Sequence, residues 1–214
     1  MKITRLGRAG VCLTTRHTTI LIDPSADGIA KAAIPSPDVL LITHGHEDRL
    51  DRALLTRLLS SDRCITVLAP EGAYHTLRAM GGGHRYVLMR PHSVYSVETV
   101  TFYAVRAEHG DTPTIGFIID DGNKTCYAVG DTLYNYDVLD DVLDLVEDGV
   151  DCVLVPLSGE DNTMHPKDAA DFAYEIGAHS AVPLFYGLYE GSVPKEFDFD
   201  NAMYLSTLEA QDIG

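Results

Sequence analysis

The chain has 214 residues, of which 45% are hydrophobic and 22% are charged, a composition that excludes disordered, fibrous and membrane-spanning proteins and suits a single domain over residues 1–214. Its 16 basic and 32 acidic residues give a net charge of −16, which would repel nucleic-acid phosphates and anionic membrane surfaces. We therefore expect no nucleic-acid partner and no membrane partner.

The N-terminal half of the sequence predicts a group of strands followed by two strand–helix steps. Short β-favouring runs predict strands over residues 2–6, 11–15 and 18–22. The continuous apolar run over 38–43 is typical of a strand covered on both faces, and helical spacing follows over 52–59. A strand over 65–68 and a helix over 70–80 repeat this succession.

The C-terminal half predicts a β-rich stretch and then alternating helices and strands. Predicted strands cover residues 85–89, 93–97, 100–107, 114–119 and 124–129. Helices over 134–147 and 166–176 alternate with strands over 152–156 and 180–184, and we expect a helical tail over 200–210. Both halves combine local pairing with helical crossovers, which predicts an α/β fold: a four-layer αββα sandwich of two mixed sheets with outer helices.

The loop after the predicted strand 38–43 carries potential metal ligands. Residues 43–51 read T-H-G-H-E-D-R-L-D. In an extended loop, residues two apart point the same way, so His44, His46 and Asp48 can converge while Gly45 permits a tight path. Imidazole and carboxylate groups are ordinary ligands of zinc, manganese and iron. The alternative interpretation is two loop histidines in solvent.

Two further candidates follow the ends of predicted strands. His109 comes after the strand 100–107, and Asp131 comes after the strand 124–129. Each position exposes a side chain at the rim of a sheet, although either residue alone is more often bonded within its own loop. Together with His44 and His46 they form a potential four-ligand set.

With these residues the sequence resembles the metallo-β-lactamase-fold hydrolases, in particular the ascorbate-6-phosphate lactonase-like branch. The resemblance covers nearly the whole chain and rests on His109 and on residues 6–10, 22–24, 44–51, 128–132, 162–166 and 182–187. It implies that His44, His46 and His109 are ligands of one metal. It also implies that Asp131 bridges two metals and that Asp48 is a ligand of the second.

The sequence departs from that family at three histidine positions. Arg49 replaces the last histidine of H-x-H-x-D-H, Phe185 replaces that of P-x-H-Y-G, and Arg8 replaces that of G-H-A. A permanent guanidinium beside Asp48 would repel a second cation. We therefore expect Arg49 to stand in for the second metal by pairing with Asp48 or Asp131. At most one ion is then held, by His44, His46, His109 and Asp131.

These residues predict a metal-dependent hydrolase of a small, anionic ester, lactone or phosphoester. The cofactor is expected to be one divalent ion, zinc in the first place, with manganese or iron as alternatives. Asp48 and Asp131 are the expected catalytic carboxylates, and Arg8, Arg49, His165 and Tyr186 are expected to bind substrate or support the site. His165 could instead be an exposed loop residue. The rival hypothesis is a metal-free, inactive relative that binds a ligand or has a structural role.

The cysteines and the N-terminus bear on the compartment. Cys12, Cys64, Cys126 and Cys152 are widely spaced and form no C-x-x-C pair, which is typical of reduced thiols. The N-terminus has no apolar segment typical of a secretory signal. We therefore expect a cytoplasmic protein that acts on a small molecule, and the sequence leaves a homo-oligomer open.

Overall fold

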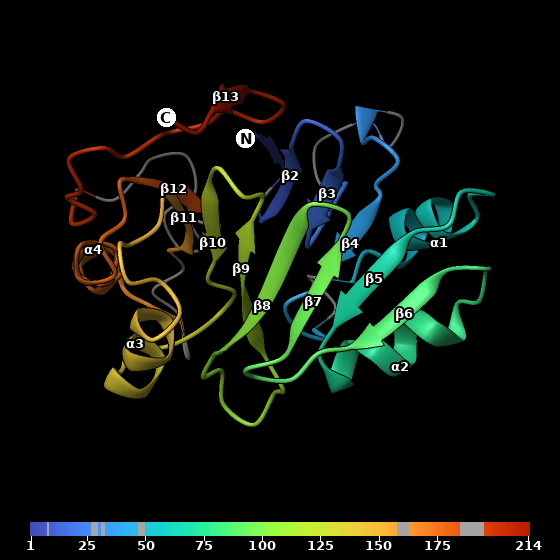
Figure 1. Ribbon diagram of the computed structural model, residues 1–214, viewed down its shortest axis with the longest axis horizontal. Helices are drawn as coiled ribbons and strands as arrows, with labels where there is room; N and C mark the ends of the chain where they lie inside the picture. Colours follow the sequence, from blue (N-terminus) through green and yellow to red (C-terminus); the bar gives the residue numbers. More distant parts are fainter. Residues whose placement is uncertain (8, 27–29, 31–32, 47–49, 158–162, 185–194) are drawn as a thin grey trace.

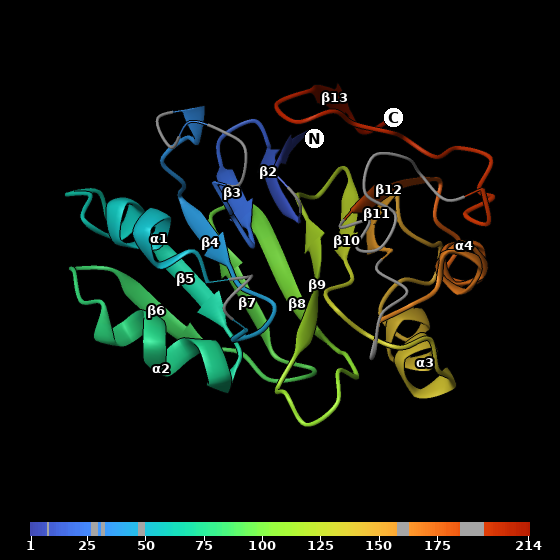
Figure 2. The same ribbon diagram turned by 180° about the vertical axis from the view of Figure 1, so that it is seen from behind.

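The computed structural model describes residues 1–7, 9–26, 30, 33–46, 50–157, 163–184 and 195–214. Two mixed β-sheets pack face to face, with helices on both outer faces (Figure 1, and Figure 2 from behind). The predicted four-layer αββα sandwich is confirmed. Among the described residues, the structure contains no helix that is both long enough and apolar enough to span a bilayer.

The first sheet combines an antiparallel and a parallel part. Its spatial order is β13 (Ala210–Asp212), β1 (Lys2–Leu6), β2 (Gly10–Thr14), β3 (Thr19–Ile22), β4 (Val39–Leu41), β5 (Thr66–Ala69) and β6 (Arg85–Leu88). The strands from β13 to β3 pair antiparallel, and those from β3 to β6 pair parallel. Helix α1 (Arg52–Leu59) connects β4 to β5, and helix α2 (Glu71–Ala79) connects β5 to β6, because a parallel connection needs a crossover.

The second sheet is mixed in the same way. Its spatial order is β12 (Ser180–Leu184), β11 (Cys152–Pro156), β10 (Thr125–Ala128), β9 (Ile115–Asp120), β8 (Val100–Arg106) and β7 (Val94–Val97). The strands from β12 to β10 pair parallel, and those from β10 to β7 pair antiparallel. Strands β8 and β10 therefore run in the same direction, and their C-terminal ends lie at the same edge of the sheet.

Helices α1 (Arg52–Leu59) and α2 (Glu71–Ala79) cover the first sheet, and α3 (Tyr136–Leu143) and α4 (Pro166–Glu175) cover the second (Figure 1). Helix α1 begins at the residue after Asp51, whose carboxylate accepts a hydrogen bond from the backbone N–H of Leu54. This bond satisfies one of the otherwise unpaired N–H groups at the helix start. It also places the helix directly after the loop that carries His44 and His46.

The central core lies between the two sheets. In β8 the buried positions alternate with less buried ones, as the two-residue period of a strand requires. The alternate residues Phe102 and Ala104 point into this core with Phe117 and Ile119 of β9. Because strands of both sheets contribute to one apolar layer, the packing of the sheets determines how the loops at their ends face one another.

Two expectations for the C-terminal half are corrected. The tail 200–210 is not helical: it forms turns, an isolated bridge and the start of β13, where Ile3 is paired with Gln211. Strand β1 has unpaired backbone groups along its edge, and hydrogen bonding to them is more favourable for the end of the tail than the helix that its local sequence favours. Helix α3 is also shorter than predicted. It ends at Leu143 with no basic residue in its last turn, and the acidic residues that follow disfavour a helix C-terminus.

Candidate metal centre

The loop that follows β4 places His44 and His46 close together. A Cβ atom at Gly45 would lie 3.0 Å from the backbone carbon of Gly72, near the start of α2. An approach this close leaves little room for a side chain, so glycine lets the loop pass against α2 without displacing it. His44 is buried and His46 is exposed. The loop therefore presents one imidazole from the interior and one from the surface.

The loops after β8 and β10 are tied to each other and to the His44 loop. The backbone N–H of Glu108 donates to the hydroxyl of Thr132 over 2.8 Å, and the N–H of Leu133 donates to the carbonyl of Glu108. Across the sandwich, the N–H of Ile115 donates to the carbonyl of Thr43 over 3.0 Å. These bonds fix the loop that carries His109 beside the loops of both sheets.

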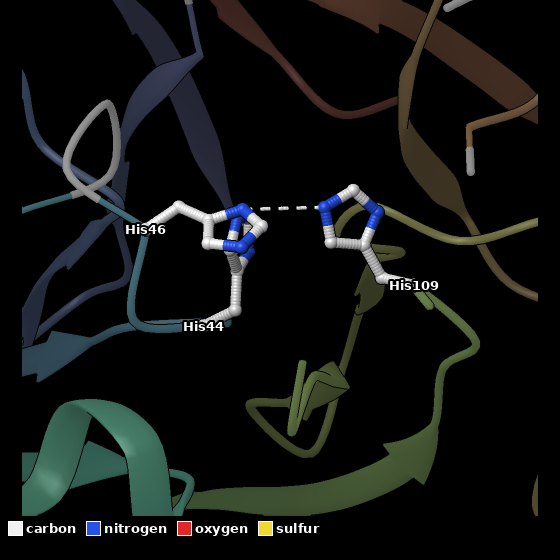
Figure 3. Close-up of side chains that lie close together, drawn as sticks. All are labelled: His44, His46 and His109. Atoms are coloured by element: carbon white, nitrogen blue, oxygen red, sulfur yellow. Dashed lines mark hydrogen bonds between the residues drawn. The ribbon is translucent and has the colours of Figure 1, made fainter. Parts of the chain in front are cut away.

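Three imidazoles meet at this edge of the sandwich. One potential ligand nitrogen each from His44, His46 and His109 lies within 4.8 Å of the others, and the ring centroids are 4.9–5.2 Å apart. Figure 3 shows His44 and His46 on one loop, with His109 approaching from the opposite side. The predicted convergence of these histidines from distant parts of the sequence is present in the structure.

Asp131 lies beside this histidine cluster. Its Oδ2 is 3.6 Å from Nε2 of His44, and both side chains are buried. It does not belong to the group whose ligand atoms all lie within 4.8 Å of one another. Gly130 permits this placement, because its φ is +73° and a Cβ there would lie 3.0 Å from the carbonyl oxygen of Ile115. Asp131 thus contacts the cluster from the side of His44.

Sequence reasoning missed two residues that contact the histidines, Thr43 and Thr112, and a third, Asp23, that contacts Thr43. The hydroxyl of Thr43 lies 3.0 Å from Nδ1 of His44 and donates to the carboxylate of Asp23 over 2.6 Å. The hydroxyl of Thr112 lies 2.8 Å from Nε2 of His46. Thr43 directly precedes His44 in the sequence, and this adjacency is a local signal from which its contact with the histidine could have been predicted. The contact between Thr112 and His46 joins positions 66 residues apart, and no local sequence pattern predicts it.

A small apolar cavity adjoins the acidic side of the site. Its volume of about 20 Å³ is enough for roughly one water molecule. Asp23, Thr43 and Asp131 line part of its wall, and apolar residues such as Leu154 and Leu184 form much of the rest. This cavity is therefore too small to hold a substrate of several atoms.

Of the other predicted site residues, the structure describes only His165. Arg8, Asp48, Arg49 and Tyr186 lie outside the described residues. His165 is exposed at the residue before α4, and its side chain does not cap that helix. It is not a member of the histidine cluster that the described residues form.

The donor set fits a divalent metal ion. Nδ1 of His46 and Nε2 of His109 are 3.3 Å apart. Two nitrogens bound tetrahedrally at about 2.0–2.1 Å from zinc would be separated by about 3.4 Å. Neutral imidazoles are ordinary zinc ligands, and the carboxylate of Asp131 next to His44 adds a negative charge that a cation would favour. The residues present therefore match the chemistry of a metal site.

Comparisons with known proteins point the same way. The model of a family described as Beta-lactamase superfamily domain matches residues 18–186. A UPF0173 protein of Pyrococcus abyssi is 30% identical over 199 residues, which cover 92% of this chain and 89% of the relative. A UPF0173 metal-dependent hydrolase of Methanopyrus kandleri is 30% identical over 207 residues, covering 88% of this chain and 85% of the relative.

Solved structures share the fold. Igni18, a metallo hydrolase of Ignicoccus hospitalis, superimposes with a TM-score of 0.79 at 19% identity, covering 98% of this chain and 97% of its own. The metallo-beta-lactamase fold protein YhfI of Bacillus subtilis gives a TM-score of 0.78 at 15% identity and covers 99% of both chains. At these identities the likeness establishes the architecture of the chain and not its substrate.

Proposed function

This chain belongs to the metallo-β-lactamase superfamily and, within it, to the UPF0173 family of metal-dependent hydrolases, and from this membership we propose that it hydrolyses a small anionic ester, lactone or phosphoester with one divalent metal ion. The observation that carries the proposal is the meeting of three imidazoles from two distant loops within 4.8 Å. Zinc is the proposed ion because nitrogen-rich sets suit it, with manganese or iron as alternatives.

The proposed ligands are His44, His46, His109 and Asp131. A divalent ion supplies Lewis acidity when it is bound, which polarises a carbonyl or phosphoryl group and makes water a stronger nucleophile near neutral pH. Asp131 lies within 3.6 Å of His44 and would offset the positive charge of the site. Asp48 follows His46 by two residues and is proposed to orient the attacking water and accept its proton.

The proposed site holds a single ion and not two. Arg49 replaces a family histidine and brings a permanent positive charge next to Asp48. That charge would repel a second cation and pair with Asp48 or Asp131. Arg8 and Arg49 would also attract an anionic substrate to a chain whose net charge is −16. Tyr186 and His165 are proposed to border the substrate. These features support a one-metal variant of the ascorbate-6-phosphate lactonase-like branch.

A second candidate function is that of a metal-free relative that binds a ligand or has a structural role. The replacement of three family histidines by Arg8, Arg49 and Phe185 favours it. The retained cluster of His44, His46 and His109 favours the hydrolase, because a structural role has no physical need for three imidazoles within 4.8 Å.

Metal content and hydrolysis by the variant His46→Ala test the proposal. We expect one equivalent of metal in the wild-type protein purified without chelator, measured by elemental analysis. The variant is expected to lose both the metal and its turnover of p-nitrophenyl esters, phosphoesters and a lactone, because a ligand nitrogen is removed. His17→Ala is the matched control, since His17 is exposed on a turn between strands. A wild-type protein without metal or turnover would support the inactive relative instead.

A further inference from the structure

A chain of hydrogen bonds leads from a buried carboxylate to the first histidine. Both carboxylate oxygens of Asp23 are used by Thr43: Oδ1 accepts from its backbone N–H over 2.8 Å and Oδ2 from its hydroxyl over 2.6 Å. Asp23 has a φ of +41°, an uncommon conformation for a residue other than glycine. The surrounding structure therefore holds this carboxylate in a strained conformation that aims it at Thr43.

The direction of this chain fixes the proton on His44. An ionised carboxylate only accepts hydrogen bonds, and a hydroxyl has a single proton to donate. The hydroxyl proton of Thr43 is therefore directed to Asp23. The same hydroxyl can then only accept at its 3.0 Å contact with Nδ1 of His44. The proton of the neutral imidazole lies on Nδ1, and the lone pair lies on Nε2, the nitrogen near Asp131.

The second histidine is arranged in the opposite way. Nδ1 of His46 faces Nε2 of His109 at 3.3 Å, whereas Nε2 of His46 faces the hydroxyl of Thr112 at 2.8 Å. Nδ1 of His46 is therefore the ring nitrogen that faces the histidine cluster. A neutral imidazole with its lone pair on Nδ1 carries its proton on Nε2, where the hydroxyl of Thr112 can accept it.

We propose that Thr43, supported by Asp23, and Thr112 are positioning residues that hold His44 and His46 in opposite tautomers. The lone pairs of Nε2 in His44 and of Nδ1 in His46 then face the cluster before any metal binds. Hydrogen bonds to the remote nitrogen of a ligating histidine fix its tautomer and orientation and raise its basicity. The inference rests on the proposed function, because it takes these imidazoles as metal ligands.

The tautomers can be read directly in the metal-free protein. Two-bond ¹H–¹⁵N correlation spectra of protein labelled with ¹⁵N-histidine distinguish a protonated from an unprotonated ring nitrogen. We expect the proton on Nδ1 in His44 and on Nε2 in His46. The proposal is overturned if either residue shows the other tautomer. This measurement does not depend on metal or turnover, so its outcome is separate from that of the proposed function.

Zinc affinity provides the second measurement. Competition with a chromophoric chelator should show a loss of roughly 10- to 100-fold in each of Thr43→Val and Thr112→Val, the range found when hydrogen-bond partners of ligating histidines are removed. Thr43→Ser and Thr112→Ser keep a hydroxyl and should recover most of the affinity. Valine variants that bind zinc like the wild type would contradict the proposal.

Two features keep the comparison interpretable. Thr112 is only half-buried, so Thr112→Val should fold even if the buried Thr43→Val does not. Thr101→Val is the matched control, because the hydroxyl of Thr101 contacts Ser96 on β7 and valine suits a strand. Its zinc affinity should equal that of the wild type. A wild type that binds no zinc would refute the proposed function and, with it, the role of these threonines in metal binding.

Discussion

The hydroxyl group of Tyr127 is buried without a hydrogen-bond partner among the described residues. The whole side chain is inaccessible to solvent and packs near Phe172 beneath the outer helices of the second sheet. Burial, reinforced by the charge of Asp141, raises the pKa of this hydroxyl far above its ordinary range. The group is therefore neutral at any physiological pH, and its unmet hydrogen-bonding capacity costs stability.

Tyr127→Phe is expected to raise the free energy of unfolding by about 1 kcal/mol, because it removes an unsatisfied polar atom and leaves the ring in place. Urea unfolding followed by circular dichroism measures the change. Tyr86→Phe is the matched control with the opposite sign, since the hydroxyl of Tyr86 donates to the carbonyl of Gly81 over 2.5 Å. A Tyr127→Phe variant less stable than the wild type would show that the hydroxyl has a partner.

Among the secondary-structure elements, the start of β10 is anchored by a carboxylate next to β11. Asp151 accepts hydrogen bonds from the ammonium group of Lys124 and from the backbone N–H of Thr125, each over 2.8 Å. Burial by itself raises the pKa of Asp151, but the hydrogen bonds and the charge of Lys124 outweigh it and leave the pKa below the ordinary 3.8. The ionised form therefore stabilises the pairing of the two strands.

This lowered pKa predicts a loss of stability in acid. The contribution of Asp151 is fully present above the unfolded pKa near 3.8 and is lost as the pH falls through the lower folded value. Asp151→Asn should reduce the stability near pH 7 and flatten its decline below pH 4, measured by thermal unfolding at a series of pH values. Asp148→Asn, in an exposed turn, should leave the profile unchanged. Equal profiles for wild type and Asp151→Asn would contradict this account.

At the scale of the whole molecule, the contact between the sheets assembles the site. The His44 loop leaves β4 in one sheet, whereas His109 and Asp131 follow β8 and β10 in the other. Phe117 of β9 is fully buried in the layer between the sheets. The relative position of the three imidazoles therefore depends on a close-packed apolar layer that contains no site residue.

Phe117→Ala is expected to lower the free energy of unfolding by about 3–5 kcal/mol, because it leaves a cavity where both sheets meet. Urea titration gives this value. Val94→Ala on the edge strand β7 is the control, since Val94 is 56% exposed and exposed substitutions usually change stability by less than about 0.5 kcal/mol. A loss for Phe117→Ala no larger than that of the control would mean that the layer relaxes to fill the space.

The layered architecture and the pair of neighbouring histidines can be predicted from the sequence alone. Alternation and continuous apolar runs encode strands within a few residues, so the strand over 180–184 and the helix over 52–59 were predicted with the bounds that the structure has. The spacing of His44 and His46 after a buried strand is equally local. These features could be predicted because neighbouring residues in the chain decide them.

The groups that complete the sheet and the histidine cluster come from distant parts of the chain, and the folded arrangement of the backbone selects them. The tail 200–210 was predicted as a helix, but the free edge of β1 recruits its end as β13. The contact of Thr112 with His46 and the use of Asp23 by Thr43 arise only after the sheets have packed. The physical reason is the same in each case: a hydrogen-bond partner separated by tens of residues is selected by the position of the backbone in space, and no local pattern encodes that position.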